Sequence, residues 1–118
     1  MLKVHAKNLE TVAFLYLEGR IVAGETEVLR NAIPPFENIT AVILDLTRVT
    51  TVDAHGLGVL LQLREQASSK GARVKLINVN KPIRQVFEIT HLNSVFQIVP
   101  GIEFFPIFAS AQRAPVAA

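Results

Sequence analysis

Residues 41–63, AVILDLTRVTTVDAHGLGVLLQL, contain the pattern that decides the fold of this chain. The first part, residues 41–46, is an apolar run with one acidic interruption, as expected of a strand that is covered on both faces or lies centrally in a sheet. Residues 47–52 mix β-branched and polar side chains and are predicted to form a short loop. Asp53 then precedes a pattern of period 3.6, so its carboxylate can accept hydrogen bonds from the unpaired amides of a helix that begins at the next residue.

The predicted helix has two different faces. The apolar stripe at steps of three and four is expected to face the sheet, and it consists of Gly56, Val59, Leu60, Leu63 and Ala67. The opposite side consists of His55, Gly58, Gln62, Glu65 and Ser69. A helix start carries unpaired N–H groups and a partial positive charge, and it can hold an anion, a phosphoryl group or a partner's carboxylate. We therefore expect the exposed first turn, with its acidic cap, to be a docking point.

Residues 44–63, LDLTRVTTVDAHGLGVLLQL, resemble the signature of STAS domains, in particular that of the anti-sigma factor antagonists, and the similarity extends over almost the whole chain. In that family a hydrophobic-Asp-Leu strand precedes Asp-Ser-Ser-Gly-Leu-Gly and an apolar helix. The resemblance implies an α/β domain that binds a serine-kinase anti-sigma factor, is phosphorylated on the second serine and then releases its partner. Asp53 fills the acidic position, Ala54 that of the first serine, and His55 that of the phosphorylated serine. The acceptor hydroxyl is therefore missing.

Length and composition limit the other classes of function. With 118 residues the chain is expected to be one STAS domain over residues 1–110, followed by a tail over residues 111–118. The net charge of +2 is spread along the chain, which argues against a nucleic-acid partner. The absence of cysteine excludes disulfides and thiolate chemistry. No apolar run approaches the roughly 20 residues of a membrane span, and the amino terminus lacks the apolar core of a signal peptide, so we expect a cytoplasmic protein without membrane insertion.

The remaining pattern predicts a mixed sheet of about four to five strands with helices packed mainly on one face. The predicted elements are an edge strand over 2–7, an antiparallel strand over 11–17 that Gly19 ends, a short helix over 25–32, a strand over 73–79, a helix from Asn80 to about Leu92, and a short strand over 95–99. The helix between the strands at 41–46 and 73–79 makes these two parallel, which places residues 53–58 at the carboxyl edge of the sheet. Phe104, Phe105, Ile107 and Phe108 are expected to close the core.

Each candidate residue also has a simple structural explanation. His55 is either an exposed residue without chemistry, or an imidazole that responds to pH or donates to a partner's carboxylate. Phosphorylation of its ring is disfavoured, because a kinase holds a serine oxygen in line with the γ-phosphate and a ring nitrogen cannot occupy the same position. Asp53 is most simply an N-cap. Gly56 and Gly58 are too far inside the helix pattern to form a phosphate loop, and they suggest close approach of the backbone to the sheet.

Three hypotheses of function follow, and none involves catalysis, since no nucleophile and base occur in a recognisable arrangement. The first is an anti-sigma factor antagonist, monomeric or weakly dimeric, whose partner surface consists of Asp53, His55, Gly56, Gly58, Gln62, Glu65 and, on the third helix, Arg84 and Glu88. The second is an adaptor subunit of a larger assembly, such as a lipid-transport ATPase complex or a stress-sensing scaffold. The third, a small anion or nucleotide behind the helix start, rests only on the helix dipole. We expect no cofactor and, because the histidines lack ligand spacing, no metal.

Overall fold

A five-stranded sheet forms the centre of the computed structural model, which describes residues 1–99 of the chain. The strands are β1 (Lys3–Leu9), β2 (Val12–Ile21), β3 (Ala41–Val52), β4 (Arg73–Ile77) and β5 (Gln97–Val99), and they lie in the sheet in this order. β1 is antiparallel to β2, and all other neighbours are parallel. The prediction of a mixed sheet with the first strand at its edge is therefore confirmed.

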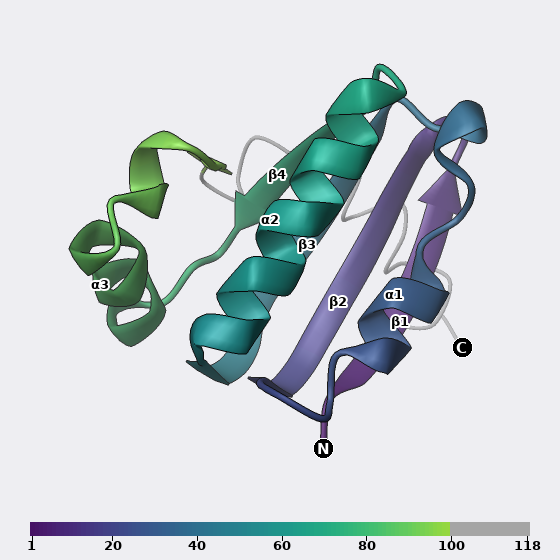
Figure 1. Cartoon of the computed structure of the whole chain (residues 1–118). Coiled ribbons are helices and arrows are strands. Elements are labelled where there is room, and N and C mark those ends of the chain that lie inside the picture. Colours follow the sequence, from purple (N-terminus) through teal and green to yellow (C-terminus); the bar gives the residue numbers. More distant parts are fainter. Residues whose placement is uncertain (100–118) are drawn as a thin grey trace.

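The helices cover one face of this sheet (Figure 1). They are α1 (Glu27–Ala32), α2 (Ala54–Ser69) and α3 (Lys81–Ile89), with short 3-10 helices η1 (Phe36–Asn38) and η2 (Leu92–Ser94). The main core joins helix residues such as Leu29, Leu60 and Phe87 to strand residues such as Leu15 and Leu44. None of the helices within residues 1–99 has both the length and the apolar character that crossing a membrane requires.

The central strand is longer than the sequence pattern indicated. Residues 47–52, predicted to be a loop, continue β3 and pair with the end of β2, so that prediction is wrong. Four consecutive β-branched residues, Val49 to Val52, favour extended backbone, and the parallel neighbour supplies the hydrogen-bonding partner that the sequence alone does not reveal. Thr50 and Thr51 consequently lie on a strand rather than in the connection to α2.

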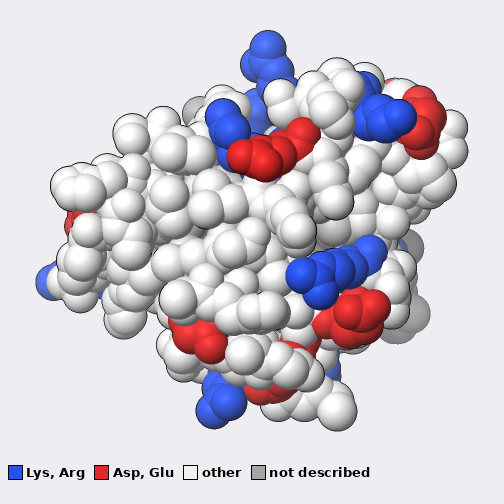
Figure 2. Space-filling model, viewed as in Figure 1, with Lys and Arg blue, Asp and Glu red and all other residues white. Residues whose placement is uncertain are grey.

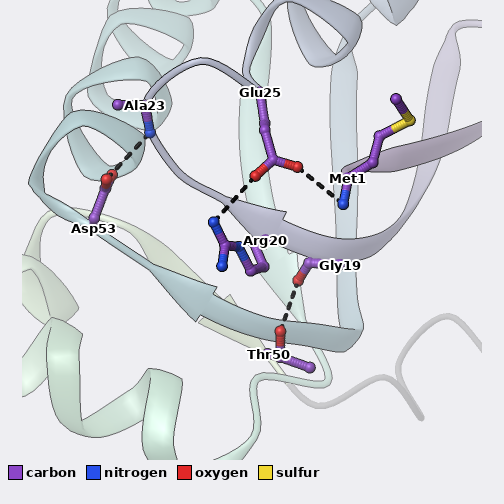
Figure 3. A network of polar contacts seen from close by, with 7 residues as sticks. All are labelled: Met1, Gly19, Arg20, Ala23, Glu25, Thr50 and Asp53. Atoms are coloured by element: carbon purple, nitrogen blue, oxygen red, sulfur yellow. Dashed lines mark hydrogen bonds and ion pairs between the residues drawn. The ribbon is translucent and has the colours of Figure 1, made fainter.

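The predicted end of β2 at Gly19 is also wrong, because the strand continues to Ile21. Gly19 has a φ of 115°, and the pairing of β2 with β3 is irregular on either side of it. A Cβ at this position would overlap the carbonyl oxygen of Met1, so only glycine fits. The Thr50 hydroxyl donates to the Gly19 carbonyl at 3.2 Å, which holds the irregular part of the strand to its neighbour (Figure 3).

Smaller differences concern the ends of the last elements. β4 ends at Ile77 instead of residue 79, because Asn78 has a φ of 56° and leaves the extended conformation. α3 ends at Ile89 rather than at about Leu92, and residues 92–94 form η2. β5 starts at Gln97 rather than at residue 95. The predictions for Phe104, Phe105, Ile107, Phe108 and the tail 111–118 lie outside the described residues.

Candidate functional site

Asp53 connects the start of α2 to the loop that follows β2 (Figure 3). Its Oδ1 accepts from the backbone N–H of Gly56 at 2.7 Å, which is the predicted N-cap. Its Oδ2 accepts from the N–H of Ala23 at 3.1 Å, and its own N–H donates to the carbonyl oxygen of Ile21 at 3.3 Å. β2 and β3 are parallel and end at the same edge of the sheet. The Asp53 carboxylate therefore joins the loop after β2 to the connection between β3 and α2.

The same hydrogen bonds control the protonation of Asp53. The N–H of Gly56, followed by that of Ala23, stabilises the charged carboxylate and lowers the pKa of Asp53 below its ordinary value of 3.8. Desolvation opposes this shift, and the adjacent His55 adds a smaller lowering. The carboxylate is therefore negatively charged at neutral pH, next to the positive end of the α2 dipole.

The two glycines of the motif have different roles. Gly56 is buried, and a Cβ at this position would overlap the backbone carbonyl of Ile21. The predicted close approach to the sheet is therefore observed, and Gly56 is removed from the predicted partner surface because a buried residue cannot contact a partner. Gly58 is exposed, and a Cβ there would meet no atom within 4 Å. Its lack of a side chain is thus not required by packing within the described residues.

The remaining α2 residues of the predicted surface are exposed and share one side of the helix. They are His55, Gly58, Gln62 and Glu65. The side chain of His55 has no hydrogen bond or ion pair with any residue between 1 and 99, so its ring is available to a partner. Gln62 accepts from Nη2 of Arg30 at 3.4 Å, and Arg30 also forms an ion pair of 3.5 Å with Glu27. The exposed side of α2 therefore continues onto α1.

Arg84 and Glu88 are exposed on α3, which lies at the β4 side of α2 (Figure 1). α3 begins at the same carboxyl edge as α2, because Asn80 links it to the extended end of β3. The Asn80 side-chain amide donates to the Val49 carbonyl at 2.8 Å, and its Oδ1 accepts from the N–H of Ile83 at 3.0 Å. The structure thus brings the starts of both helices to one edge, with α3 packed on β3 and η2.

Figure 2 shows charged side chains in a few separate groups, with a broad uncharged area between them. A cavity of about 280 Å³ lies between α1 and α2 and is lined mainly by apolar side chains, with Arg30 and Gln62 among the polar ones. On α2 it is lined by Val59, Gln62, Leu63 and Gln66, so it is not at the helix start where the third hypothesis places a small anion or nucleotide. In the described part of the chain, no three His, Asp or Glu residues are grouped as a metal site requires.

Sequence reasoning missed Ala23 and Arg30. Ala23 contributes only a backbone N–H, and no side-chain pattern signals such a donor. The sequence does contain a glycine, Gly24, after the predicted strand, and glycine is typical of turns. In the structure Gly24 has a φ of 85° and lies in the loop that follows β2. Arg30 lies in a short helix that was predicted, but its contact with Gln62 depends on how α1 packs beside α2.

Comparisons with known proteins agree with this architecture. The family model of the STAS domain matches residues 3–114. A STAS-domain containing protein of Pseudomonas aeruginosa is 27% identical over 88 residues, which cover 71% of this chain and 84% of that protein. The match to the family model includes β3, Asp53 and the whole of α2.

Two solved structures have the same fold. The anti-sigma factor antagonist SpoIIAA of Bacillus, in its unphosphorylated form, superimposes with a TM-score of 0.72 at 18% identity, over 90% of this chain and 94% of that chain. The murine anion transporter Slc26a9 superimposes with a TM-score of 0.68 at 19% identity. This second match covers 89% of the present chain but 18% of the transporter. At these identities the two likenesses establish the fold.

Proposed function

Because the chain belongs to the STAS domain family, we propose that it is a regulatory protein-binding module of the anti-sigma factor antagonist type. It binds an anti-sigma factor of the serine-kinase class in the cytoplasm, releases a sigma factor and catalyses no reaction itself. The observation that carries the proposal is the exposed His55 at the start of α2, above an Asp53 that two backbone N–H groups hold in place. The likeness to SpoIIAA adds support at the level of the fold.

The proposed partner surface consists of Asp53, His55, Gly58, Gln62 and Glu65, with Arg84 and Glu88 at its α3 side. The positive end of the α2 dipole and the free imidazole both favour a carboxylate from the partner. Gly58 lets a partner approach the helix backbone closely, because no side chain covers it.

His55 makes partner binding independent of phosphorylation at the family's position. A phosphoserine there would add about 1.5 to 2 negative charges and repel an acidic or apolar contact. A kinase that aligns a serine oxygen with the γ-phosphate of ATP does not place an imidazole nitrogen at the same point. Thr50 does not substitute for the missing hydroxyl, since its own hydroxyl is hydrogen-bonded to Gly19 within the sheet. Control of this protein therefore lies in its abundance or in another partner.

Phosphorylation assays test the proposed partner class. The chain, His55→Ser and His5→Ser are each incubated with candidate kinase-type anti-sigma factors and ATP, and phosphopeptides are identified by mass spectrometry. His5 is also exposed, but it lies on β1, so it controls for the substitution itself. We expect label on His55→Ser only, at the new serine. A phosphorylated His55 peptide from the unchanged chain would contradict the loss of the switch, and failure to label His55→Ser with every kinase would contradict the partner class.

Binding measurements test the partner surface. Gly58→Trp adds bulk to the middle of the proposed surface and is expected to weaken the complex with the anti-sigma factor at least about tenfold, the scale of one lost interface anchor. Ser69→Trp adds the same bulk at the far end of α2 and serves as the matched control. Equal affinities of Gly58→Trp and Ser69→Trp would show that the partner binds elsewhere.

A second candidate function is supported by the fold shared with part of the Slc26a9 transporter. In this alternative the domain is an adaptor in a larger assembly, such as a transport complex or a stress-sensing scaffold, and has no sigma-regulating partner. Affinity purification from the native cell separates the two functions. Recovery of a kinase-type anti-sigma factor supports the antagonist, whereas recovery of a membrane transport subunit or of a large homologous assembly supports the adaptor.

A further inference from the structure

The cavity between α1 and α2 has an apolar floor. Its volume is about 280 Å³. Leu29 of α1 and Val59 and Leu63 of α2 line it, and these three side chains are 0%, 4% and 5% exposed. All three belong to the main hydrophobic core, so the floor of the cavity is formed by core side chains. Such a surface binds an apolar group better than it binds water.

A second side of the cavity is formed where the chain leaves α1. Ile33, Pro34, Pro35 and Phe36 line this side. Ile33 is the C-cap of α1 and has extended backbone, and η1 begins at Phe36. The two consecutive prolines between these points restrict the backbone, because each pyrrolidine ring fixes its own φ. The cavity is therefore largely formed before a ligand arrives, which is usual for sites of small molecules.

The lining of the cavity contains one positive charge. Arg30 is the only charged residue among the lining residues that lie between positions 1 and 99. Its Nη2 donates to Oε1 of Gln62 at 3.4 Å and so links α1 to α2. Gln66, one turn further along α2, adds a second exposed amide to the lining. A mainly apolar lining with a few polar side chains is the usual composition of a small-molecule site.

Arg30 keeps free donors for an anion. Its Nη1 forms an ion pair of 3.5 Å with Oε2 of Glu27. The two side chains are 44% and 75% exposed, and an exposed ion pair of this kind contributes little to stability. A guanidinium group has five N–H groups, so the contacts with Gln62 and Glu27 leave others available. Glu27 does not line the cavity, so only the positive member of the pair contributes to the lining.

We propose that this cavity binds a small carboxylate with an apolar body. The apolar body packs on Leu29, Val59 and Leu63, and the carboxylate accepts hydrogen bonds from the guanidinium group of Arg30. A planar carboxylate matches two parallel N–H groups of one guanidinium, whereas a phosphate dianion needs more donors than one arginine supplies. This site does not depend on the proposed function, and it is tested on the chain alone, without a protein partner.

The volume of the cavity limits the size of the ligand. An apolar protein cavity of about 150 Å³ holds benzene. Drug-sized ligands occupy pockets of about 300–1,000 Å³. The cavity of about 280 Å³ therefore fits one aromatic ring with a short carboxylate arm. Phenylacetate has this composition and is the probe that we choose.

NMR titration of the full chain tests the position of the site. The methyl signals of Leu29, Val59 and Leu63 are followed while phenylacetate is added. We expect saturable shifts of these three signals. Ile83, a buried residue of α3 that does not line the cavity, should change little. An absence of shifts at Leu29, Val59 and Leu63 would overturn the proposal.

Two further probes separate the apolar body from the charge. Phenylacetamide has the same ring without the charge, and acetate has the charge without the ring. We expect phenylacetate to bind at least about tenfold more tightly than either, because a hydrogen bond to a charged group and the burial of a ring each contribute on this scale. Equal affinity for phenylacetamide would contradict the role of Arg30, and equal affinity for acetate would contradict the apolar body.

A variant of Arg30 tests the positive charge. Arg30→Gln is expected to remove the preference for phenylacetate over phenylacetamide, while the ring still binds. Arg64→Gln makes the same change on α2, outside the lining of the cavity, and should keep the preference. If Arg30→Gln keeps the preference as Arg64→Gln does, the carboxylate binds to another group and the proposal is wrong.

A bulky side chain tests the cavity itself. Gln66→Trp is expected to occupy part of the cavity and to weaken the binding of phenylacetate at least about tenfold, the scale of one lost anchor. Ser69→Trp adds the same bulk at the end of the same helix, outside the lining, and is the matched control. Equal affinities of the two variants would contradict the proposal. The titrations of the unchanged chain with the three probes decide without any variant.

Discussion

Oδ2 of Asp53 accepts a hydrogen bond from the backbone N–H of Ala23 at 3.1 Å. This bond joins the residue between β3 and α2 to the loop that follows β2. The other carboxylate oxygen caps α2 at Gly56. An ordinary N-cap satisfies the amides of one helix, whereas this carboxylate also fixes the loop between β2 and α1 (Figure 3). The first turn of α2 is therefore held in place on two sides.

Removal of the Asp53 carboxylate is expected to destabilise the first turn of α2 and the loop between β2 and α1. Asp53→Ala should lower the midpoint of thermal unfolding by about 5–10 °C, since a lost cap costs a domain of this size several degrees and the bond to Ala23 is lost with it. Differential scanning calorimetry measures the change. Glu65→Ala removes an exposed carboxylate from the same helix and is expected to shift the midpoint by less than about 2 °C. Equal shifts in the two variants would contradict the double role of Asp53.

The contribution of Asp53 to stability depends on pH. Its pKa in the folded protein is lowered below 3.8, chiefly by the N–H of Gly56, so the folded state binds the proton less readily than the unfolded state. The stabilisation is complete above the unfolded pKa and is lost as the pH falls through the lower folded pKa. The difference in free energy of unfolding between the unchanged chain and Asp53→Asn should thus be constant near neutral pH and shrink as the pH falls below 3.8. Urea titrations check this, and a difference that grows on acidification would refute it.

Gly56 and Gly58 are expected to respond oppositely to alanine. Gly56→Ala should destabilise the fold by about 1–3 kcal/mol, because the new Cβ overlaps the Ile21 carbonyl and forces the helix away from β2. Gly58→Ala should stabilise the fold by about 0.5–1 kcal/mol, because its Cβ enters open space and alanine has the higher helix propensity. Each variant is the control of the other in equilibrium urea unfolding. Destabilisation by Gly58→Ala would mean that its surroundings are more crowded than described.

Asn80 is expected to fix α3 to the sheet. Asn80→Ala removes the cap at Ile83 and leaves the part-buried Val49 carbonyl without its 2.8 Å donor, a loss of about 1–3 kcal/mol. Amide hydrogen exchange should become faster throughout α3 and remain unchanged in β2. Asn93→Ala, at an exposed position in η2, is the matched control. If exchange in α3 is the same in both variants, other contacts hold the helix.

The faces of α2 could be predicted because they depend on local periodicity. Gly56, Val59, Leu60, Leu63 and Ala67 are buried, as their spacing of three and four residues indicated, and His55, Gly58, Gln62, Glu65 and Ser69 are exposed. The cap by Asp53 was likewise predicted, since its side chain bonds to the amide of Gly56, three residues ahead. Such contacts need only the helix itself.

The extent of the strands could not be predicted in this way. Residues 47–52 contain polar side chains and looked like a connection, but β2 continues past Gly19 and pairs with them. Whether a β-branched and polar stretch is strand or loop depends on a neighbouring strand from a distant part of the sequence. Propensity describes only the residue and its local backbone.

The amino-acid sequence by itself determined the family, the order of the elements and the exposed start of α2, because hydrophobic period and helix capping act over a few neighbouring residues. Only the tertiary structure decided that Gly56 faces Ile21, that Asp53 reaches Ala23, and that Arg30 meets Gln62. These contacts join residues from different elements, and their geometry follows from how the helices and strands pack on the sheet.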